Sequence, residues 1–241
     1  MEAKNSNNLA LLYLLGSSLI RDGQVQKGEV LVDRIISEGG PAEAHLLLGA
    51  AEAATYDTTG ALGQLGLAIM LDPKLPLAHY LYGKELLATA GSRSEAMKCF
   101  REELAIDPNE FGSNLYLGVL LNQEHRFNEV MPYLQRAVEV RPGNAPATLQ
   151  IAVAQIGMQQ FEQAREALEA LVKARPTFLA AHVSLATVYY RLHMRQGGDR
   201  EEAIIRKLSA EAEAQTRAEG ESHLPSKAAN TSPENAQDTP P

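Results

Sequence analysis

The 241-residue sequence contains no tryptophan and a single cysteine, Cys99. One cysteine excludes an internal disulfide framework and a cysteine-rich zinc site, and it gives no sign of an oxidising compartment. On a helix, a lone cysteine usually behaves as a small apolar residue rather than as a reactive thiol. We therefore expect Cys99 to be a half-buried packing residue.

Positive charge is also scarce, because 22 Lys and Arg stand against 30 Asp and Glu, which gives a formal net charge of −8. An acidic chain without a basic run repels phosphate backbones and anionic lipids. The composition therefore argues against nucleic-acid binding and against docking on an anionic membrane.

Long apolar runs are missing as well. The run at residues 9–20 has only 12 residues, whereas a membrane-spanning helix needs about 20. Its flanks lack the positive cluster and the cleavage site of a signal peptide. We interpret the run as the first helix of a repeat, with a degenerate signal segment as the alternative. The protein is then expected in the cytoplasm, without a membrane span.

The sequence contains no metalloprotease, hydrolase, phosphate-binding or dinucleotide-binding motif. Three glycines, Gly60, Gly63 and Gly66, imitate a phosphate-binding loop, but they follow an expected helix and turn rather than a strand. We therefore predict no enzymatic activity, no catalytic residue, no metal site and no cofactor.

The sequence does contain a repeat. Its prolines are spaced 35, 34 and 34 residues apart at Pro73, Pro108, Pro142 and Pro176. Upstream of them, small residues recur at intervals of 33 to 35 residues, at Gly16, Gly49, Gly83, Gly118, Ala152 and Ala186. Two independent landmarks with one period are strong evidence of an internal repeat.

Each unit contains two amphipathic helical patterns joined by a short polar turn, as in residues 114–123 and 127–140, and is closed by a proline, which cannot continue a helix. We expect a small residue twelve positions after the recurrent one, such as Ala61 after Gly49, to let the two helices approach closely. In the fourth unit this position is Val130, opposite Gly118. Larger apolar residues four positions later fill the hairpin core, at Val32, Leu65, Phe100, Leu134 and Leu168.

This pattern resembles the tetratricopeptide repeat family, whose 34-residue unit carries an L-G pair, a later Ala, a large apolar residue and a closing Pro. The match reads across Leu48, Gly49, Ala61, Leu65, Ala68 and Pro73. The resemblance implies an all-α, right-handed α-solenoid of about six helix–turn–helix repeats. One departure is Glu103, which stands where a small residue is expected. The expected organisation is an N-terminal extension (1–8), repeat units at 9–41, 42–75, 76–110, 111–144, 145–178 and 179–218, and a disordered acidic, proline-rich tail (219–241).

The two ends of the array differ. In the last unit we expect a long turn at residues 195–200 and then a capping helix from Glu201, with one apolar stripe of Ile204, Leu208 and Ala212. At the other end, the helix in residues 9–20 is apolar nearly all round, and no capping helix precedes it. We hypothesise that a partner chain, a second copy or an upstream segment covers it, at Leu12, Leu15 and Leu19.

Three histidines, His45, His79 and His182, replace the usual aromatic residue before the L-G pair. Equivalent residues of adjacent units lie about 10 Å apart, which is too far for shared coordination of one metal at about 2 Å. We interpret these histidines as packing residues.

The resemblance implies a concave groove lined by the first helix of each unit, at the positions three before and one after the recurrent small residue. Some of these residues could instead pack against neighbouring units. We predict a groove that binds a peptide or an amphipathic helix of an unknown protein partner, with Tyr residues as anchors. It suits an acidic C-terminal tail poorly, because the Lys and Asn that clamp such tails in the family are replaced in the first unit. The alternative function is a structural or assembly component that associates through its uncapped N-terminal edge. The candidate groove residues are Tyr13, Ser17, Leu46, Ala50, Tyr80, Lys84, Leu115, Val119, Asn122, Leu149, Val153, Val183, Thr187 and Tyr190.

Overall fold

The computed structural model describes residues 40–89 and 92–222, with side chains to Thr216, and ten further residues between Leu15 and Ser37. Within these residues the chain forms helices, turns and short connections, and no strand. Most of the predicted first unit (9–41), the candidate groove residues Tyr13 and Ser17, and all but the first four residues of the predicted disordered tail (219–241) lie outside the described residues. Of the three leucines of the N-terminal edge, Leu15 is 51% exposed, Leu19 is partly buried and Leu12 is not described.

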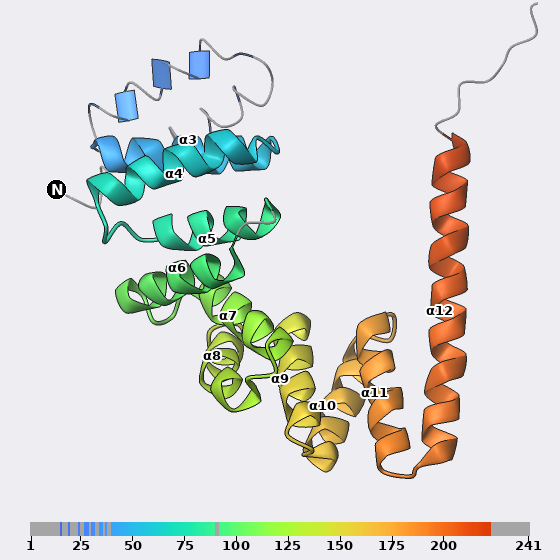
Figure 1. Ribbon diagram of the computed structural model, residues 1–241. Coiled ribbons are helices and arrows are strands. Elements are labelled where there is room, and N and C mark those ends of the chain that lie inside the picture. Colours follow the sequence, from blue (N-terminus) through green and yellow to red (C-terminus); the bar gives the residue numbers. More distant parts are fainter. Residues whose placement is uncertain are drawn as a thin grey trace, which may run out of the picture.

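The described helices pair into five successive hairpins, and the prediction of an all-α helical repeat solenoid is confirmed. Each helix packs against its hairpin mate and against the next helix along the chain, and neighbouring first helices also touch. Figure 1 shows the hairpins stacked into an arc, with the first helices α5, α7 and α9 toward its inside and the second helices α6, α8 and α10 toward its outside. The hairpins are α3 (Pro41–Ala54) with α4 (Thr58–Leu71), α5 (Ala78–Ala88) with α6 (Arg93–Ile106), α7 (Phe111–Gln123) with α8 (Phe127–Val140), α9 (Ala145–Gly157) with α10 (Phe161–Ala174), and α11 (Leu179–Arg191) with α12 (Arg195–Ser222).

The predicted closing prolines stand two residues after the ends of α4, α6, α8 and α10. In the two units that end in Asp-Pro, the aspartate side chain organises the turn: Asp72 Oδ1 accepts from the Lys74 N–H and Asp107 Oδ1 from the Asn109 N–H, each at 2.9 Å. Proline removes a backbone donor while aspartate supplies an acceptor, so the helix stops and the chain turns into the next hairpin.

The recurrent glycines meet a different partner from the one that the sequence predicts. A Cβ atom at Gly49 would lie 2.6 Å from Leu65 Cγ, and one at Gly118 would lie 2.2 Å from Leu134 Cδ2. The predicted partners twelve positions on, such as Val130, are buried but are not the nearest atoms. A helical side chain leans toward the N-terminus of its own helix. The large residue one turn further along therefore reaches back over the glycine and fills the space.

The last hairpin corrects a second prediction. The segment 195–200 is not a long turn, because α12 begins at Arg195 and runs to Ser222, past the predicted boundary at 218. Gly197 and Gly198 lie inside this helix, where added Cβ atoms would come within 2.9 Å of the Tyr189 ring and 2.5 Å of the Tyr190 ring. These glycines therefore let two tyrosines of α11 pack closely against α12. Of the predicted stripe, Ile204 and Leu208 are partly buried, whereas Ala212 is exposed.

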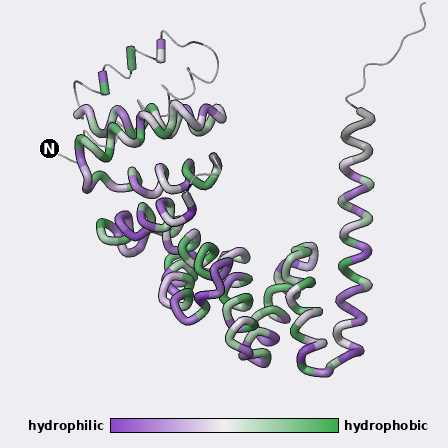
Figure 2. Tube along the Cα trace, in the orientation of Figure 1, coloured by the Kyte–Doolittle hydropathy of each residue, from purple (hydrophilic) through white to green (hydrophobic). Residues whose placement is uncertain are grey.

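Beyond its first turns, α12 stands clear of the other helices (Figure 1) and is largely hydrophilic (Figure 2). Every described side chain from Ala210 to Thr216 is exposed. Only the N-terminal half of α12 therefore closes the array.

The turn between the two helices of a hairpin places one residue in the left-handed backbone region. In four hairpins this residue stands seven positions after the recurrent small residue and is not glycine: Tyr56 (φ 64°), His125 (φ 57°), Gln159 (φ 62°) and His193 (φ 60°). L-residues other than Asn and Asp enter this region at a cost of about 1–2 kcal/mol. The repeat therefore carries the same backbone strain four times within the described residues.

This strain predicts a stabilising substitution. Tyr56→Gly should raise the free energy of unfolding by about 0.5–1 kcal/mol, because glycine adopts positive φ without a steric penalty, and the 93% exposed side chain gives up little packing. Urea unfolding followed by circular dichroism measures the change. The neighbouring Thr55 has φ −97° and its hydroxyl donates to the Glu52 carbonyl. Thr55→Gly should therefore destabilise, and a gain from both substitutions would contradict the explanation.

Candidate functional site

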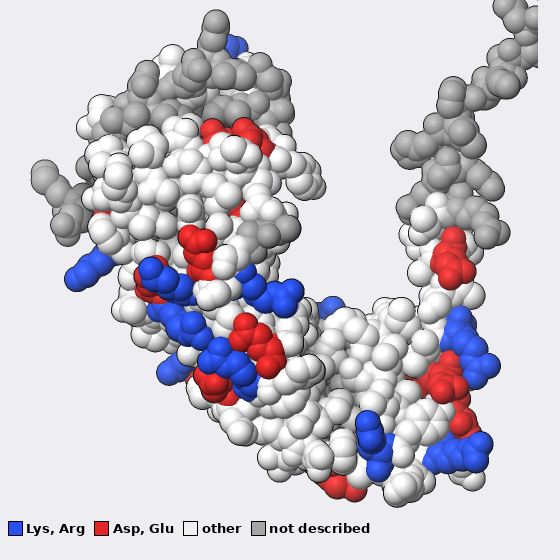
Figure 3. Space-filling view, in the orientation of Figure 1, with Lys and Arg blue, Asp and Glu red and all other residues white. Residues whose placement is uncertain are grey.

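The first helices of the fourth to sixth units are almost free of charge. Neither α7 nor α9 contains an Asp, Glu, Lys or Arg, and α11 has only Arg191 at its end. The second helices α6, α8 and α10 come before and between these first helices along the chain. They carry three to six charged residues each. Figure 3 shows the contrast as a largely white surface over α9 and α11 beside red and blue groups on α6, α8 and α12. The inner side of the arc is therefore the uncharged side in this part of the array.

The candidate groove residues differ in exposure along the array. Most of those on α3, α5, α7 and α9 are half-buried: Leu46, Ala50, Tyr80, Lys84, Leu115, Val119 and Val153. Those on α11 are exposed, with Val183 at 47% and Tyr190 at 38%, and Thr187 is exposed between them. Asn122 and Leu149 are buried. The most accessible of the described candidate residues are therefore those on α11, near the C-terminal end of the array.

Tyr80 belongs to a joint between hairpins and does not project freely as an anchor. A Cβ atom at Gly112 of α7 would lie 2.2 Å from the Tyr80 ring, so the ring occupies the space that this glycine leaves. The same ring lies 6.3 Å from that of Phe100 and 6.2 Å from that of Tyr116. Burial raises the pKa of the Tyr80 hydroxyl to about 12. Its main contribution is to hold α5 against α7.

Asn122 and Leu149 also serve the array itself. The Asn122 Nδ2 group donates to the backbone carbonyl and to the side-chain Oε1 of Gln150, each at 2.9 Å, which ties α7 to α9. Leu149 packs in the core formed by the last two hairpins. Their burial leaves little surface for a ligand.

The exposed surface of α11 forms one stripe, which we call the α11 stripe: Ala180, Val183, Thr187 and Tyr190. The spacing of three and four residues places these side chains on one side of the helix. The sequence prediction missed Ala180, although it stands one turn before Val183.

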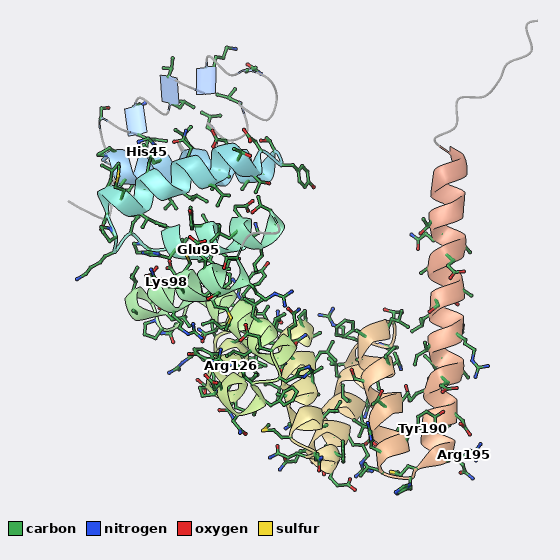
Figure 4. All side chains as sticks on the ribbon, in the orientation of Figure 1. His45, Glu95, Lys98, Arg126, Tyr190 and Arg195 are labelled. Atoms are coloured by element: carbon green, nitrogen blue, oxygen red, sulfur yellow. The ribbon has the colours of Figure 1, made fainter. Side chains whose placement is uncertain are left out.

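The hydroxyl groups of the α11 stripe have partners within the protein. The Thr187 hydroxyl donates to the Val183 carbonyl and the Tyr190 hydroxyl to Asp199 Oδ1, each at 3.0 Å. Figure 4 shows Tyr190 beside the start of α12, where Arg195 is labelled. Since its donors are used internally, the stripe presents mainly apolar surface to a ligand.

Two of the three histidines expected as packing residues, His79 and His182, are hydrogen-bonded links between units. A prolyl carbonyl can only accept, so His79 Nε2 donates to the Pro73 carbonyl at 3.0 Å and His182 Nε2 to the Pro176 carbonyl at 2.9 Å. Asn114 stands at the same repeat position and donates to the Pro108 carbonyl at 3.0 Å. The contact that recurs is therefore a hydrogen bond from a side chain of one unit to the carbonyl of the closing proline of the unit before. The residue types alone did not reveal this bond.

The second ring nitrogen of each histidine faces the second helix of its own hairpin. His45 Nδ1 lies 2.7 Å from Gln64 Oε1, and His182 Nδ1 lies 2.6 Å from Glu201 Oε2. His45 is labelled on α3 in Figure 4. Hollows of about 500 and 520 Å³ lie beside His79 and His182, next to the closing prolines and away from the α11 stripe.

Two further features bear on chemistry. Cys99 is buried rather than half-buried, and desolvation raises the pKa of its thiol to about 11, which keeps it protonated. Among the described residues, no three or more His, Cys, Asp or Glu side chains gather as a metal site would require. Nor does any helix in that part of the chain combine the length and apolarity that a membrane span needs.

The comparisons with known proteins agree with this architecture. Residues 121–193 match the family model described as tetratricopeptide repeat. A crystal structure of YrrB, described as a TPR protein with an unusual peptide-binding site, superposes with a TM-score of 0.67 at 18% identity, covering 78% of this chain and 97% of that one. MamA from Desulfovibrio magneticus RS-1 (41 to end) gives a TM-score of 0.65 at 21% identity, covering 72% and 97%. An RS-1 MamA double mutant gives 0.66 at 21%, covering 73% and 98%.

No curated protein matches the sequence. At 18–21% identity the solved structures show a common fold. The family match spans the end of α7 to the end of α11, where the alanine landmarks Ala152 and Ala186 and the proline landmarks Pro142 and Pro176 are each 34 residues apart. The repeat period and the five hairpins agree with this match, which identifies residues 121–193 as tetratricopeptide repeats within an all-α helical repeat array.

Proposed function

We propose that the protein is a non-enzymatic interaction scaffold that holds an apolar, extended or helical segment of a partner protein along the inner face of the arc. The observation that carries this proposal is the lack of charge on α7, α9 and α11 together with the exposed α11 stripe. Water-facing helices of soluble proteins normally carry charged residues. An uncharged, apolar inner face is therefore best explained by a ligand that covers it. YrrB, described as having a peptide-binding site, is a precedent on the same fold.

The chemistry of this face favours an apolar ligand. Val183 and Tyr190 offer apolar area, and tyrosine is among the residue types that dominate binding energy at interfaces. The half-buried Val119 and Val153 extend the apolar surface toward the middle of the array. Lys84 on α5 is the one cation among the described candidate residues. An acidic segment would find few cationic partners on this face, whereas an apolar segment would give up no hydrogen bonds to water when it binds.

The proposed binding surface comprises the accessible and half-buried candidates on successive first helices, and it continues onto the first unit, outside the described residues. Asn122 and Leu149 support it from beneath by joining α7 to α9 and α9 to α11. The surface is Leu46, Ala50, Lys84, Leu115, Val119, Val153, Val183, Thr187 and Tyr190, with Tyr80 at its margin and Tyr13 and Ser17 in the first unit.

A charge placed on the α11 stripe tests the proposal. Peptides selected on the wild-type protein from a random display library should share apolar or aromatic residues. Val183→Glu should weaken their binding at least tenfold, about 1.4 kcal/mol, because a carboxylate would be desolvated without a partner. Fluorescence titration of a labelled peptide measures the change.

Val140→Glu on α8 is the matched control, since Val140 is a 37% exposed valine on a second helix. It should leave peptide affinity unchanged, and both variants should keep the helical content of the wild type. Selected peptides that are predominantly acidic, or equal weakening by the two variants, would refute the proposal.

A further inference from the structure

Helix α4 differs from the other second helices in having no charged residue along its 14 positions. Its outward residues are spaced as one helical stripe and are largely apolar. Leu67 is 39% exposed, Met70 68% and Leu71 46%. We call this stripe the α4 outer face: Thr59, Gly63, Leu67, Met70 and Leu71.

Several of the equivalent positions of later hairpins are charged. Arg136 and Glu139 of α8 stand 69 residues after Leu67 and Met70, and they pair with each other at 2.9 Å. On α10, Glu166 and Lys173 stand 103 residues after Gly63 and Met70. These helices therefore have the charged outer face that contact with water favours, whereas α4 does not. Figure 3 shows the surface over α4 as almost entirely white.

Gly63 points to an explanation outside the chain. Glycine inside a helix costs about 1 kcal/mol relative to alanine, and Gly49 and Gly60 have internal reasons, since added Cβ atoms would lie 2.6 Å from Leu65 and 2.6 Å from Asp57. At Gly63, an added Cβ atom would meet nothing within 4 Å. A glycine with no internal neighbour, in the middle of an exposed apolar stripe, allows the backbone of another molecule to approach closely.

We propose that the α4 outer face packs against the same face of a second copy of this chain, with the two α4 helices crossing near Gly63. The formal net charge of −8 makes two copies repel each other over most of their surfaces. At the α4 outer face no like charges meet. A two-fold contact sets one patch against itself. An uncharged stripe with projecting Leu67 and Met70 beside the gap at Gly63 is suited to self-complementary packing.

The contact is small. A single helix pair buries less than the roughly 1,200 Å² of a standard interface, so the expected dissociation constant lies at roughly 1 µM to 1 mM. Added salt should strengthen the dimer, because it screens repulsion between acidic copies.

This proposal goes beyond the proposed function and does not depend on it. Helix α4 is the second helix of its hairpin, whereas the described residues of the proposed binding surface all lie on first helices. The dimer would carry two open inner faces. Peptide binding and self-association can therefore fail separately.

Sedimentation velocity of the full chain, over protein concentrations spanning the expected dissociation constant, tests the proposal. The wild type should show a monomer–dimer equilibrium. Met70→Glu and Leu71→Glu should each raise the dissociation constant at least tenfold, because they bring two carboxylates together at the two-fold contact. Val140→Glu is the matched control, since Val140 stands 69 residues after Leu71 at the same repeat position and is similarly exposed. It should leave the dissociation constant unchanged.

Gly63→Ala separates association from folding. Within one chain the new methyl group meets open space, so the monomer should become more stable, whereas the dimer should weaken at least tenfold because the helices can no longer approach. A wild type that stays monomeric throughout, or a dimer that tolerates all three α4 substitutions, would overturn the proposal.

Discussion

Replacing Glu103 by alanine should lower the free energy of unfolding by about 2–4 kcal/mol, because the change leaves buried backbone donors without acceptors. Glu103 is fully buried on α6. Its Oε1 accepts from the Leu77 N–H at 2.7 Å, and its Oε2 accepts from the Tyr80 N–H at 3.2 Å. Both donors belong to the start of α5, where Leu77 has a left-handed backbone, with φ 71°.

The reason for this arrangement is the late start of α5. Helices α7, α9 and α11 begin seven residues before their recurrent small residue, whereas α5 begins five residues before Gly83. The two missing helical residues leave backbone donors inside the array, and the carboxylate of Glu103 satisfies two of them. Glu102→Ala is the matched control, since its neighbouring carboxylate is 41% exposed and lies 3.2 Å from His79 Nδ1 and 3.6 Å from Lys98 Nζ. It should cost less than about 1 kcal/mol. Equal losses of unfolding free energy for the two variants, measured in urea, would contradict the role of Glu103 as acceptor at the start of α5.

The same carboxyl predicts a dependence on pH. Desolvation raises the pKa of Glu103 above its ordinary value of 4.5, although the hydrogen bonds from Leu77 and Tyr80 oppose the shift. A raised pKa means that the folded chain binds this proton more tightly than the unfolded chain. Its contribution to stability is therefore fully present below about pH 4.5 and falls as pH rises through the folded pKa.

Glu103→Gln isolates this contribution, because the amide has no charge to titrate. The difference in free energy of unfolding, wild type minus Glu103→Gln, should decrease from about pH 4 upward. Urea titrations at several pH values measure it. A difference that does not change with pH, or that increases, would contradict the raised pKa.

The sequence was enough to predict the repeat and its phase, because both follow from local chemistry. A proline cannot continue a helix, and a glycine inside one needs a packing reason, so each marks the same point of every unit. The sequence also identified Glu103 as a departure from the pattern. It could not supply the reason, since that lies in the start of a neighbouring helix 26 residues away at Leu77.

The uncharged character of the first helices was predictable from the sequence, whereas the contacts of individual side chains were not. That α7 and α9 lack charge can be read from the sequence once their bounds are known. Whether a particular side chain faces a ligand or a neighbouring unit depends on contacts between hairpins. Tyr80 is held against Gly112 of the next hairpin, and Asn122 reaches Gln150. Neither partner can be inferred from a pattern within one unit.

Glycine gave the misleading signal in the last unit. Gly197 and Gly198 follow one another, and paired glycines usually indicate a turn. In the structure they continue α12, because the rings of Tyr189 and Tyr190 need the space that side chains would fill. The regular 34-residue spacing was the better guide: Gly198 stands twelve residues after Ala186, as Ala164 does after Ala152.

The recurrent glycine provides the second large effect. Gly118→Ala should lower the free energy of unfolding by about 1–3 kcal/mol, even though alanine favours helix formation. The added Cβ atom would lie 2.2 Å from Leu134 Cδ2, and Leu134 is fully buried. Either α7 and α8 must move apart or Leu134 must leave its preferred rotamer. Urea unfolding at low protein concentration measures the loss.

A double-mutant cycle shows whether Leu134 is the cause. In a Leu134→Ala background the space beside Gly118 is open, so Gly118→Ala should cost much less, with a coupling of at least about 1 kcal/mol. The fifth unit shows that alanine at this position is compatible with the fold, since Ala152 and Leu168 are both fully buried there. The expected loss therefore arises from the helix spacing that Gly118 has set in its own hairpin. Gly63→Ala is the control for helix propensity, and it should stabilise the monomer by up to about 1 kcal/mol. Additive effects of the two substitutions at 118 and 134 would mean that Leu134 does not occupy the space above the glycine.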